Sequence, residues 1–136
     1  QATQSSGPRR LLVNQTIDGD VKALYIQGKY DANRRPILTV GTFPTMGTRV
    51  GITLDIGTFE ANQFISRVKF DKHEIEEYNV LYSPNLQTMI IVNDDALRFM
   101  SKVKKASQVI IELDIYNEGK VSAIFDVRGF DERKIR

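Results

Sequence analysis

The sequence predicts a mainly β protein, either an antiparallel β-sandwich or a partly open barrel, with one α-helix near the C-terminus. Three observations support this fold class. Short runs of alternating or β-branched residues recur between turn signals along most of the chain. One late segment, at about 94–106, has helical periodicity instead. Finally, 41% of the 136 residues are hydrophobic and 26% are charged, as in an ordinary globular domain that can bury its own core.

The first half of the chain predicts two β-hairpins. Strand candidates at 11–17 and 21–27 flank Asp18-Gly19-Asp20, where glycine permits the positive φ of a tight turn. A second pair of strand candidates, at 37–43 and 49–56, flanks a Pro-Thr-Met-Gly turn signal. The apolar face of the fourth strand is expected to carry Val50, Ile52, Leu54 and Ile56.

The second half predicts further strands and a closing hairpin. Residues 64–71 alternate, with Phe64, Val68 and Phe70 expected on the apolar face, and strands are also expected at 78–82 and 86–92. The segments 109–116 and 121–128 alternate on either side of an Asn-Glu-Gly-Lys turn. A slip of one residue would move their whole apolar row into solvent, so their register is well specified.

The helix prediction depends on capping and periodicity. Asn93 is a preferred N-cap residue, Asp94 and Asp95 suit the positive first turn, and lysines gather near the last turn. The apolar stripe that should lie against a sheet consists of Ala96, Leu97, Phe99, Met100 and Val103.

The chain is expected to form a single β-rich domain at 9–130. Residues 1–8 are polar and suit a flexible lead-in, and residues 131–136 form a charged tail. If Gln1 is a mature end, a removed signal peptide would place the protein in the periplasm or outside the cell, and otherwise its localisation stays open. No apolar run approaches the roughly 20 residues of a transmembrane helix.

Residue types that commonly carry catalysis are scarce. The chain has no cysteine, and its one histidine, His73, lies in the charged run 69–77, where a solvated loop residue is favoured over a member of a catalytic triad. Residues 93–95 could offer oxygen ligands, but the glycine and the final glutamate of an EF-hand loop are missing. We therefore predict no catalytic residue, no metal site and no cofactor. The alternative is a small hydrolase that uses carboxylates in a sheet-end cleft on a cell-wall or carbohydrate substrate.

The formal net charge of +2 is too small to create a strong phosphate-attracting field, so nucleic acid is not an expected partner. Basic residues nevertheless occur in groups. If the fold gathers them on one face, they could bind an anionic polymer or a lipid headgroup, whereas scattered solubilising charge is the simpler interpretation. The candidate binding residues are Arg34, Arg35, Lys102, Lys105 and Arg128.

The C-terminal part of the chain resembles a known group of proteins. The run from Tyr82-Ser83-Pro84-Asn85 through LRFMSKVKKA to AIFDVRGF ends in a Phe-x-x-x-Gly-Phe pattern at Phe125, Gly129 and Phe130. It is similar to bacterial envelope proteins of the invasion-associated locus B family and to accessory proteins of type VI secretion. The resemblance covers residues 78–130 and implies antiparallel strands with a late helix. It also implies an exported, non-enzymatic accessory role, and it carries over no catalytic residue.

The predicted function is accordingly a non-enzymatic, exported binding or accessory module that docks a protein partner in the cell envelope. A further hypothesis is self-assembly, in which the closing hairpin lends an edge strand to another copy and forms a homo-oligomer.

Overall fold

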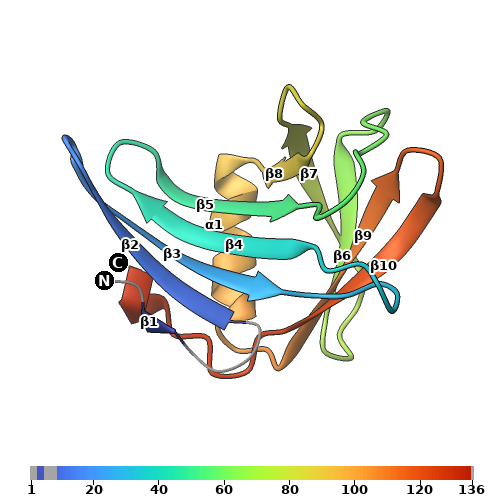
Figure 1. Ribbon diagram of the computed structural model, residues 1–136. Coiled ribbons are helices and arrows are strands. Elements are labelled where there is room, and N and C mark those ends of the chain that lie inside the picture. The colour runs from blue at the N-terminus through green and yellow to red at the C-terminus, as the bar shows by residue number, and fades with distance from the viewer. Residues whose placement is uncertain (1–2, 5–8, 136) are drawn as a thin grey trace.

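The computed structural model describes residues 3–4 and 9–135, which form one curved antiparallel sheet around a single α-helix (Figure 1). In this part of the chain the strand order is β1-β2-β3-β4-β5-β8-β7-β6-β9-β10. The sheet does not close completely, although Lys29, just after β3, pairs with Ile124 of β10. The mainly β prediction is confirmed, in its partly open barrel form. The elements are β1 (Thr3–Gln4), β2 (Arg9–Thr16), β3 (Gly19–Gln27), β4 (Ile37–Phe43), β5 (Gly47–Thr53), β6 (Ile65–Phe70), β7 (Glu76–Tyr82), β8 (Thr88–Ile91), α1 (Asn93–Val103), β9 (Gln108–Ile115), β10 (Gly119–Asp126) and the 3-10 helix η1 (Glu132–Ile135).

Both predicted N-terminal hairpins are confirmed. Thr16 pairs with Gly19 at the first turn, and Phe43 pairs with Gly47 at the second. The fourth strand ends earlier than predicted, at Thr53, because the chain then bends away from the ladder. Ile56 is consequently exposed, and its placement on the apolar face was wrong.

The strands of the second half also follow the predicted alternation. Phe64 is the exception: it precedes β6, is exposed, and its ring lies 5.9 Å from that of Tyr82. In the closing hairpin Val121 pairs with Leu113 and Phe125 with Val109. The apolar row of this hairpin is buried at Val109, Ile111, Leu113, Ile115, Ala123, Phe125 and Val127.

The helix is confirmed, but its predicted cap and one residue of its stripe are wrong. It begins one residue early, with Val92 at the N-cap position and no side-chain cap, because the Val92 carbonyl already accepts a hydrogen bond from the Ala96 N–H. Buried positions 96, 99, 100 and 103 follow the helical repeat. Leu97 lies about 100° further around the helix than Ala96 and is 60% exposed.

The core lies between α1 and the inner face of the sheet, where Phe70, Tyr78 and Phe99 pack edge-to-face with ring centroids 5.2–6.5 Å apart. Ile135 of η1 is also buried, so this part of the predicted charged tail at 131–136 packs onto the domain. Most of the predicted lead-in at 1–8 lies outside the described residues, apart from the backbone of β1. No helix in the described ranges is long and apolar enough to cross a membrane.

Candidate docking surface

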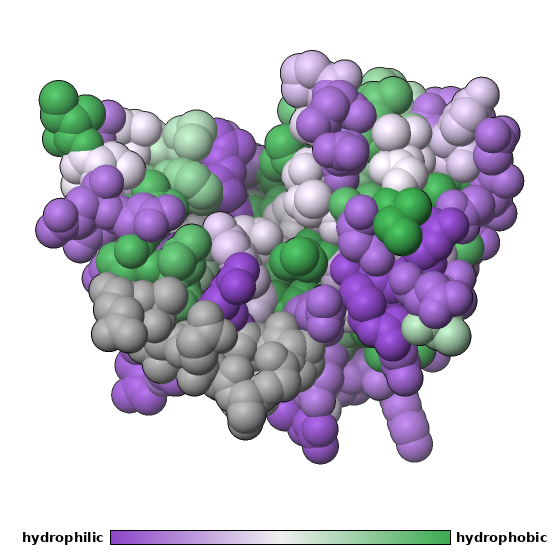
Figure 2. Space-filling model, in the orientation of Figure 1, coloured by the Kyte–Doolittle hydropathy of each residue, from purple (hydrophilic) through white to green (hydrophobic). Residues whose placement is uncertain are grey.

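The face of the sheet that points away from α1, here called the outer face, is hollowed over β4, β5 and β8. Because side chains alternate along β5, Val50 and Ile52 enter the core while Arg49 and Gly51 point outward. The hollow has a volume of about 450 Å³. Figure 2 shows this side of the molecule indented between the β4–β5 and β7–β8 hairpins, with hydrophobic atoms on both flanks. Its lining includes Thr39, Phe43, Met46, Arg49, Gly51 and Ile90.

Missing side chains create the hollow. Gly51 pairs with Thr39 on one side and with Ile90 on the other, so the middle of this row has no side chain to fill it. Gly41, which pairs with Arg49, is buried, and an added Cβ there would lie only 3.1 Å from Ala23, so the strands pack closely beside the arginine. The floor is therefore backbone, and larger side chains stand around it.

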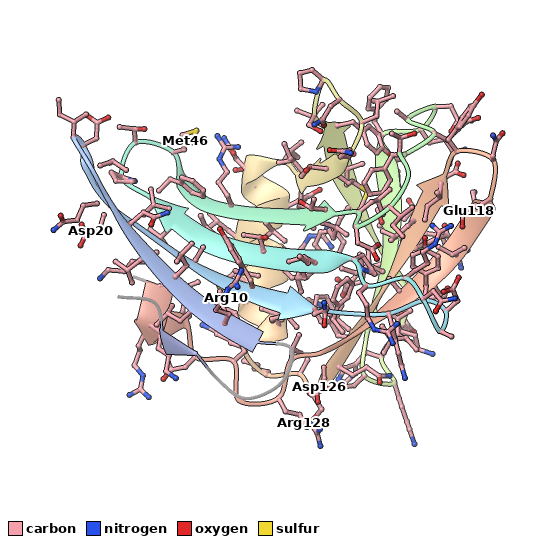
Figure 3. All side chains as sticks on the ribbon, viewed as in Figure 1. Arg10, Asp20, Met46, Glu118, Asp126 and Arg128 are labelled. Atoms are coloured by element: carbon pink, nitrogen blue, oxygen red, sulfur yellow. The ribbon has the colours of Figure 1, made fainter. Side chains whose placement is uncertain are left out.

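Apolar side chains at the rim are exposed to solvent. Met46, at the β4–β5 turn, is 50% exposed and lies at the upper left in Figure 3. On the other side, Ile90 pairs across the strands with Leu81, which is 55% exposed. These residues extend the hollow into an apolar patch, which is typical of surfaces that contact other molecules.

Arg49 separates this hollow from a neighbouring one lined by Leu81, Asp94 and Asp95. Its Nε atom is buried and has no hydrogen-bond partner in the part of the chain that the structure describes. An unsatisfied buried donor costs roughly 1–3 kcal/mol. The Arg49 side chain is only partly buried and makes no ion pair within residues 10–135, so a ligand carboxylate that pairs with its guanidinium would offset part of that cost. The outer-face hollow can therefore hold an apolar side chain together with an anionic group.

The predicted binding residues Arg34 and Arg35 lie in the loop after β3, where their side chains form hydrogen bonds that hold the loop in place. The Nη1 atom of Arg34 donates to the Tyr30 hydroxyl at 2.7 Å and to the Glu118 carboxylate at 2.9 Å. The Nη1 atom of Arg35 donates to the backbone carbonyls of Asp31 and Arg34, at 2.9 and 3.1 Å. Arg35 thus fixes the loop against itself, and Arg34 also fixes it against the β9–β10 turn.

Lys102 and Lys105 are brought together at the C-terminal end of α1. Both line an open hollow of about 500 Å³ that also contains His73 and Glu74. Lys102 is ion-paired with Glu76, and Lys105 is an exposed residue of the same hollow. Of the five predicted residues, these two therefore line the same hollow.

Arg128 pairs with Asp126 at 2.6 Å just beyond the end of β10, whereas Arg34 contacts Glu118 just before its start. Figure 3 shows Glu118 and Arg128 at opposite ends of this strand. Eight residues of extended chain, Gly119–Asp126, span roughly 26 Å. The five predicted residues are therefore distributed over three places, and a shared anion-binding role for them stays a prediction.

A polar network joins one side of α1 to β7. Arg98 stacks 3.8 Å from the Tyr78 ring centroid and donates to the Glu77 carbonyl at 2.7 Å. Burial acts to raise the pKa of Glu76, but hydrogen bonds from Lys102 and Tyr78 outweigh it and hold that pKa below its usual value. The pKa of Asp95 is likewise lowered: burial opposes the shift, and the Asn79 backbone N–H and the Arg98 guanidinium prevail. These groups fasten the helix to the sheet.

Carboxylates near His73 also have structural partners. One oxygen of Asp71 accepts hydrogen bonds from the backbone N–H groups of Ser107 and Gln108, both at 3.0 Å. Glu76 accepts from Tyr78 and Lys102. Within the described ranges, no group of three or more His, Cys, Asp or Glu side chains is placed to hold a metal ion.

Comparison with known proteins identifies the fold. No protein-family model and no curated protein sequence matches the chain. Among solved structures, the chain is similar to the crystal structure of invasion associated protein B from Bartonella henselae, with a TM-score of 0.60 and 17% sequence identity. The match covers 93% of this chain and 89% of that one. The two proteins share a fold. The resemblance predicted from residues 78–130 is thus confirmed for the fold and extends beyond them.

Sequence reasoning missed the residues of the outer-face hollow. Arg49 begins the predicted strand 49–56, with no basic neighbour to draw attention to it. Gly41 and Gly51 are visible in the sequence, but glycines in strands equally indicate bulges or bends. The available signal was that both occupy outward positions of adjacent strands, and it acquires meaning only once the pairing of β4 with β5 and of β5 with β8 is known.

Proposed function

We propose that this protein is a non-enzymatic binding module that docks a protein partner in the bacterial cell envelope through its outer-face hollow. The observation that carries the proposal is the Arg49 guanidinium, which lines an apolar hollow and has no ion pair within residues 10–135. The exposed side chains of Met46 and Leu81 add contact area beside it. A surface of this kind stabilises a complex by burying apolar area and by giving the guanidinium an acceptor.

The setting in the cell envelope is supported by the fold shared with an invasion associated bacterial protein. The same setting fits a periplasmic or extracellular location, which we propose together with it. Cell fractionation tests the location directly, because the proposal requires the protein to leave the cytoplasm.

Site-specific photo-cross-linking in the producing cells tests the docking surface. A photoreactive residue at position 46 should yield a cross-linked envelope protein, and Arg49→Ala should reduce its yield at least about tenfold. The matched control places the same residue at Ile56, which is as exposed as Met46 but lies beside Gly57, near Glu118 of the β9–β10 turn. Equal cross-linking at both positions, or a yield insensitive to Arg49→Ala, would contradict the proposal.

A further inference from the structure

The tip of the β2–β3 hairpin carries an apolar side chain that is fully exposed and packs against none of the described residues. Ile17 is 100% exposed and occupies the two-residue turn between the paired residues Thr16 and Gly19. Polar residues and glycine dominate such turns. Figure 2 shows hydrophobic atoms at the far end of this hairpin, projecting from the body of the molecule. An isoleucine here gains burial only if another surface covers it.

The hairpin tip lies at the same end of the molecule as the outer-face hollow. A Cβ atom on Gly19 would come within 3.3 Å of the Pro44 ring, so the tip leans on the β4–β5 turn. Phe43 and Met46, from the same turn, line the hollow. Ile17 does not enter the hollow of its own molecule, since its side chain is fully exposed.

The chemistry of the tip complements that of the hollow. Asp18 follows Ile17 directly, and its carboxylate has neither a hydrogen bond nor an ion pair within residues 10–135. Arg49 has no ion pair within those residues either, and its Nε lacks an acceptor. The tip thus offers an apolar side chain next to a carboxylate, and the hollow offers an apolar recess next to a guanidinium. The two surfaces are chemically complementary.

We infer that the outer-face hollow receives the β2–β3 hairpin tip of a second copy of this chain. Ile17 enters between Phe43, Met46 and Ile90, and the Asp18 carboxylate accepts hydrogen bonds from Arg49. Because each molecule carries a tip and a hollow at the same end, two copies related by a two-fold axis exchange tips, and each contact occurs twice. This inference rests on the docking role proposed above for the hollow, and it names an occupant: a second copy fills the hollow until the envelope partner displaces it.

Sedimentation velocity from micromolar to millimolar protein tests the dimer. The wild-type protein should dimerise with increasing concentration, and Ile17→Ser should raise the dimer Kd about 100-fold, that is about tenfold for each of two contacts. The thermal midpoint of the variant should not change, because the Ile17 side chain is fully exposed in the monomer. Leu97→Ser is the matched control: Leu97 is also exposed, but it lies on α1.

A charge exchange tests the polar half of the contact. Asp18→Arg and Arg49→Glu should each weaken the dimer, and the double variant should recover most of the lost affinity. A dimer that Ile17→Ser leaves unchanged, or a protein that stays monomeric throughout, overturns the inference. So does a dimer that is weakened by Met46→Glu but not by Ile17→Ser, because another occupant then fills the hollow.

The two proposals fail separately. If only the self-association is wrong, Ile17→Ser leaves the envelope cross-link from position 46 intact and no dimer forms in the purified protein. If only the envelope partner is wrong, the purified protein still dimerises through Ile17, and the cross-link from position 46 joins two copies of this chain alone.

Discussion

Two glycines show that the absence of a side chain permits close packing at one position and leaves a surface hollow at another. Gly28, which is buried, lies against the ring of Phe125, whose Cδ2 and Cε2 would be only 2.5 Å from an added Cβ. Gly51 forms the floor of the outer-face hollow, and an added Cβ there would make ordinary contacts of 3.5 Å with Met89 and Thr88. The first glycine allows the core to close, and the second keeps a surface open.

Gly28→Ala is therefore expected to destabilise the protein while Gly51→Ala is tolerated. The new methyl group at Gly28 overlaps both the Phe125 ring and the Ile124 carbonyl oxygen, at 2.8 Å, and should lower the free energy of unfolding by about 1–3 kcal/mol. Gly51→Ala should change it by less than about 0.5 kcal/mol. Urea denaturation of both variants checks this pair, and equal midpoints would show that the Phe125 ring moves aside without cost.

Helix α1 is held by apolar packing on its inner side and by charged contacts along the edge that faces β7. Phe99 and Val103 enter the core, while Arg98 and Lys102 contact Glu76. The sequence predicts the first set from its period of 3.6 residues. It does not predict the second, because Glu76 lies in a separate strand that looks like a solvated charged run when it is taken alone.

Acid should loosen this attachment. The folded-state pKa values of Glu76 and Asp95 are lowered, so their stabilising effect is complete above the ordinary carboxyl range near pH 4 and is lost as the pH falls through the lowered values. Urea midpoints measured from pH 7 to pH 2.5 should decline more steeply for wild type than for the Glu76→Gln/Asp95→Asn double variant. Glu74→Gln, an exposed change in the same region, serves as the control. Parallel curves for all three proteins would mean that the network adds nothing to stability.

The molecule as a whole brings one end of its sheet, strand β10, against the chain that follows β3 without closing the barrel. Lys29 and Ile124 exchange backbone hydrogen bonds of 3.1 and 2.8 Å between the chain after β3 and strand β10. The short helix η1 then places Ile135 in the core. The last described residues therefore help to close the side of the sheet that the strand ladder leaves open.

Ile135→Ala should lower the free energy of unfolding by about 2–5 kcal/mol, the range for truncating a buried isoleucine. Lys134→Ala, one residue earlier and exposed, should have little effect and controls for changes to η1 itself. Thermal and urea denaturation measure both. If Ile135→Ala unfolds at the wild-type midpoint, η1 contributes no stability and the domain is complete without it.

The sequence by itself determined the helix, most of the strands and most of their apolar positions, because periodicity is a local property: Val109 and Ile111 are two residues apart whatever lies around them. Only the tertiary structure decided which side chains share a surface. Gly51, Arg49 and Ile90 become one surface because β5 pairs with β8, across almost forty positions of chain. Arg34 and Arg128, by contrast, lie at opposite ends of one strand. Pairing between distant segments depends on how the whole chain packs, and a short window of sequence does not contain that information.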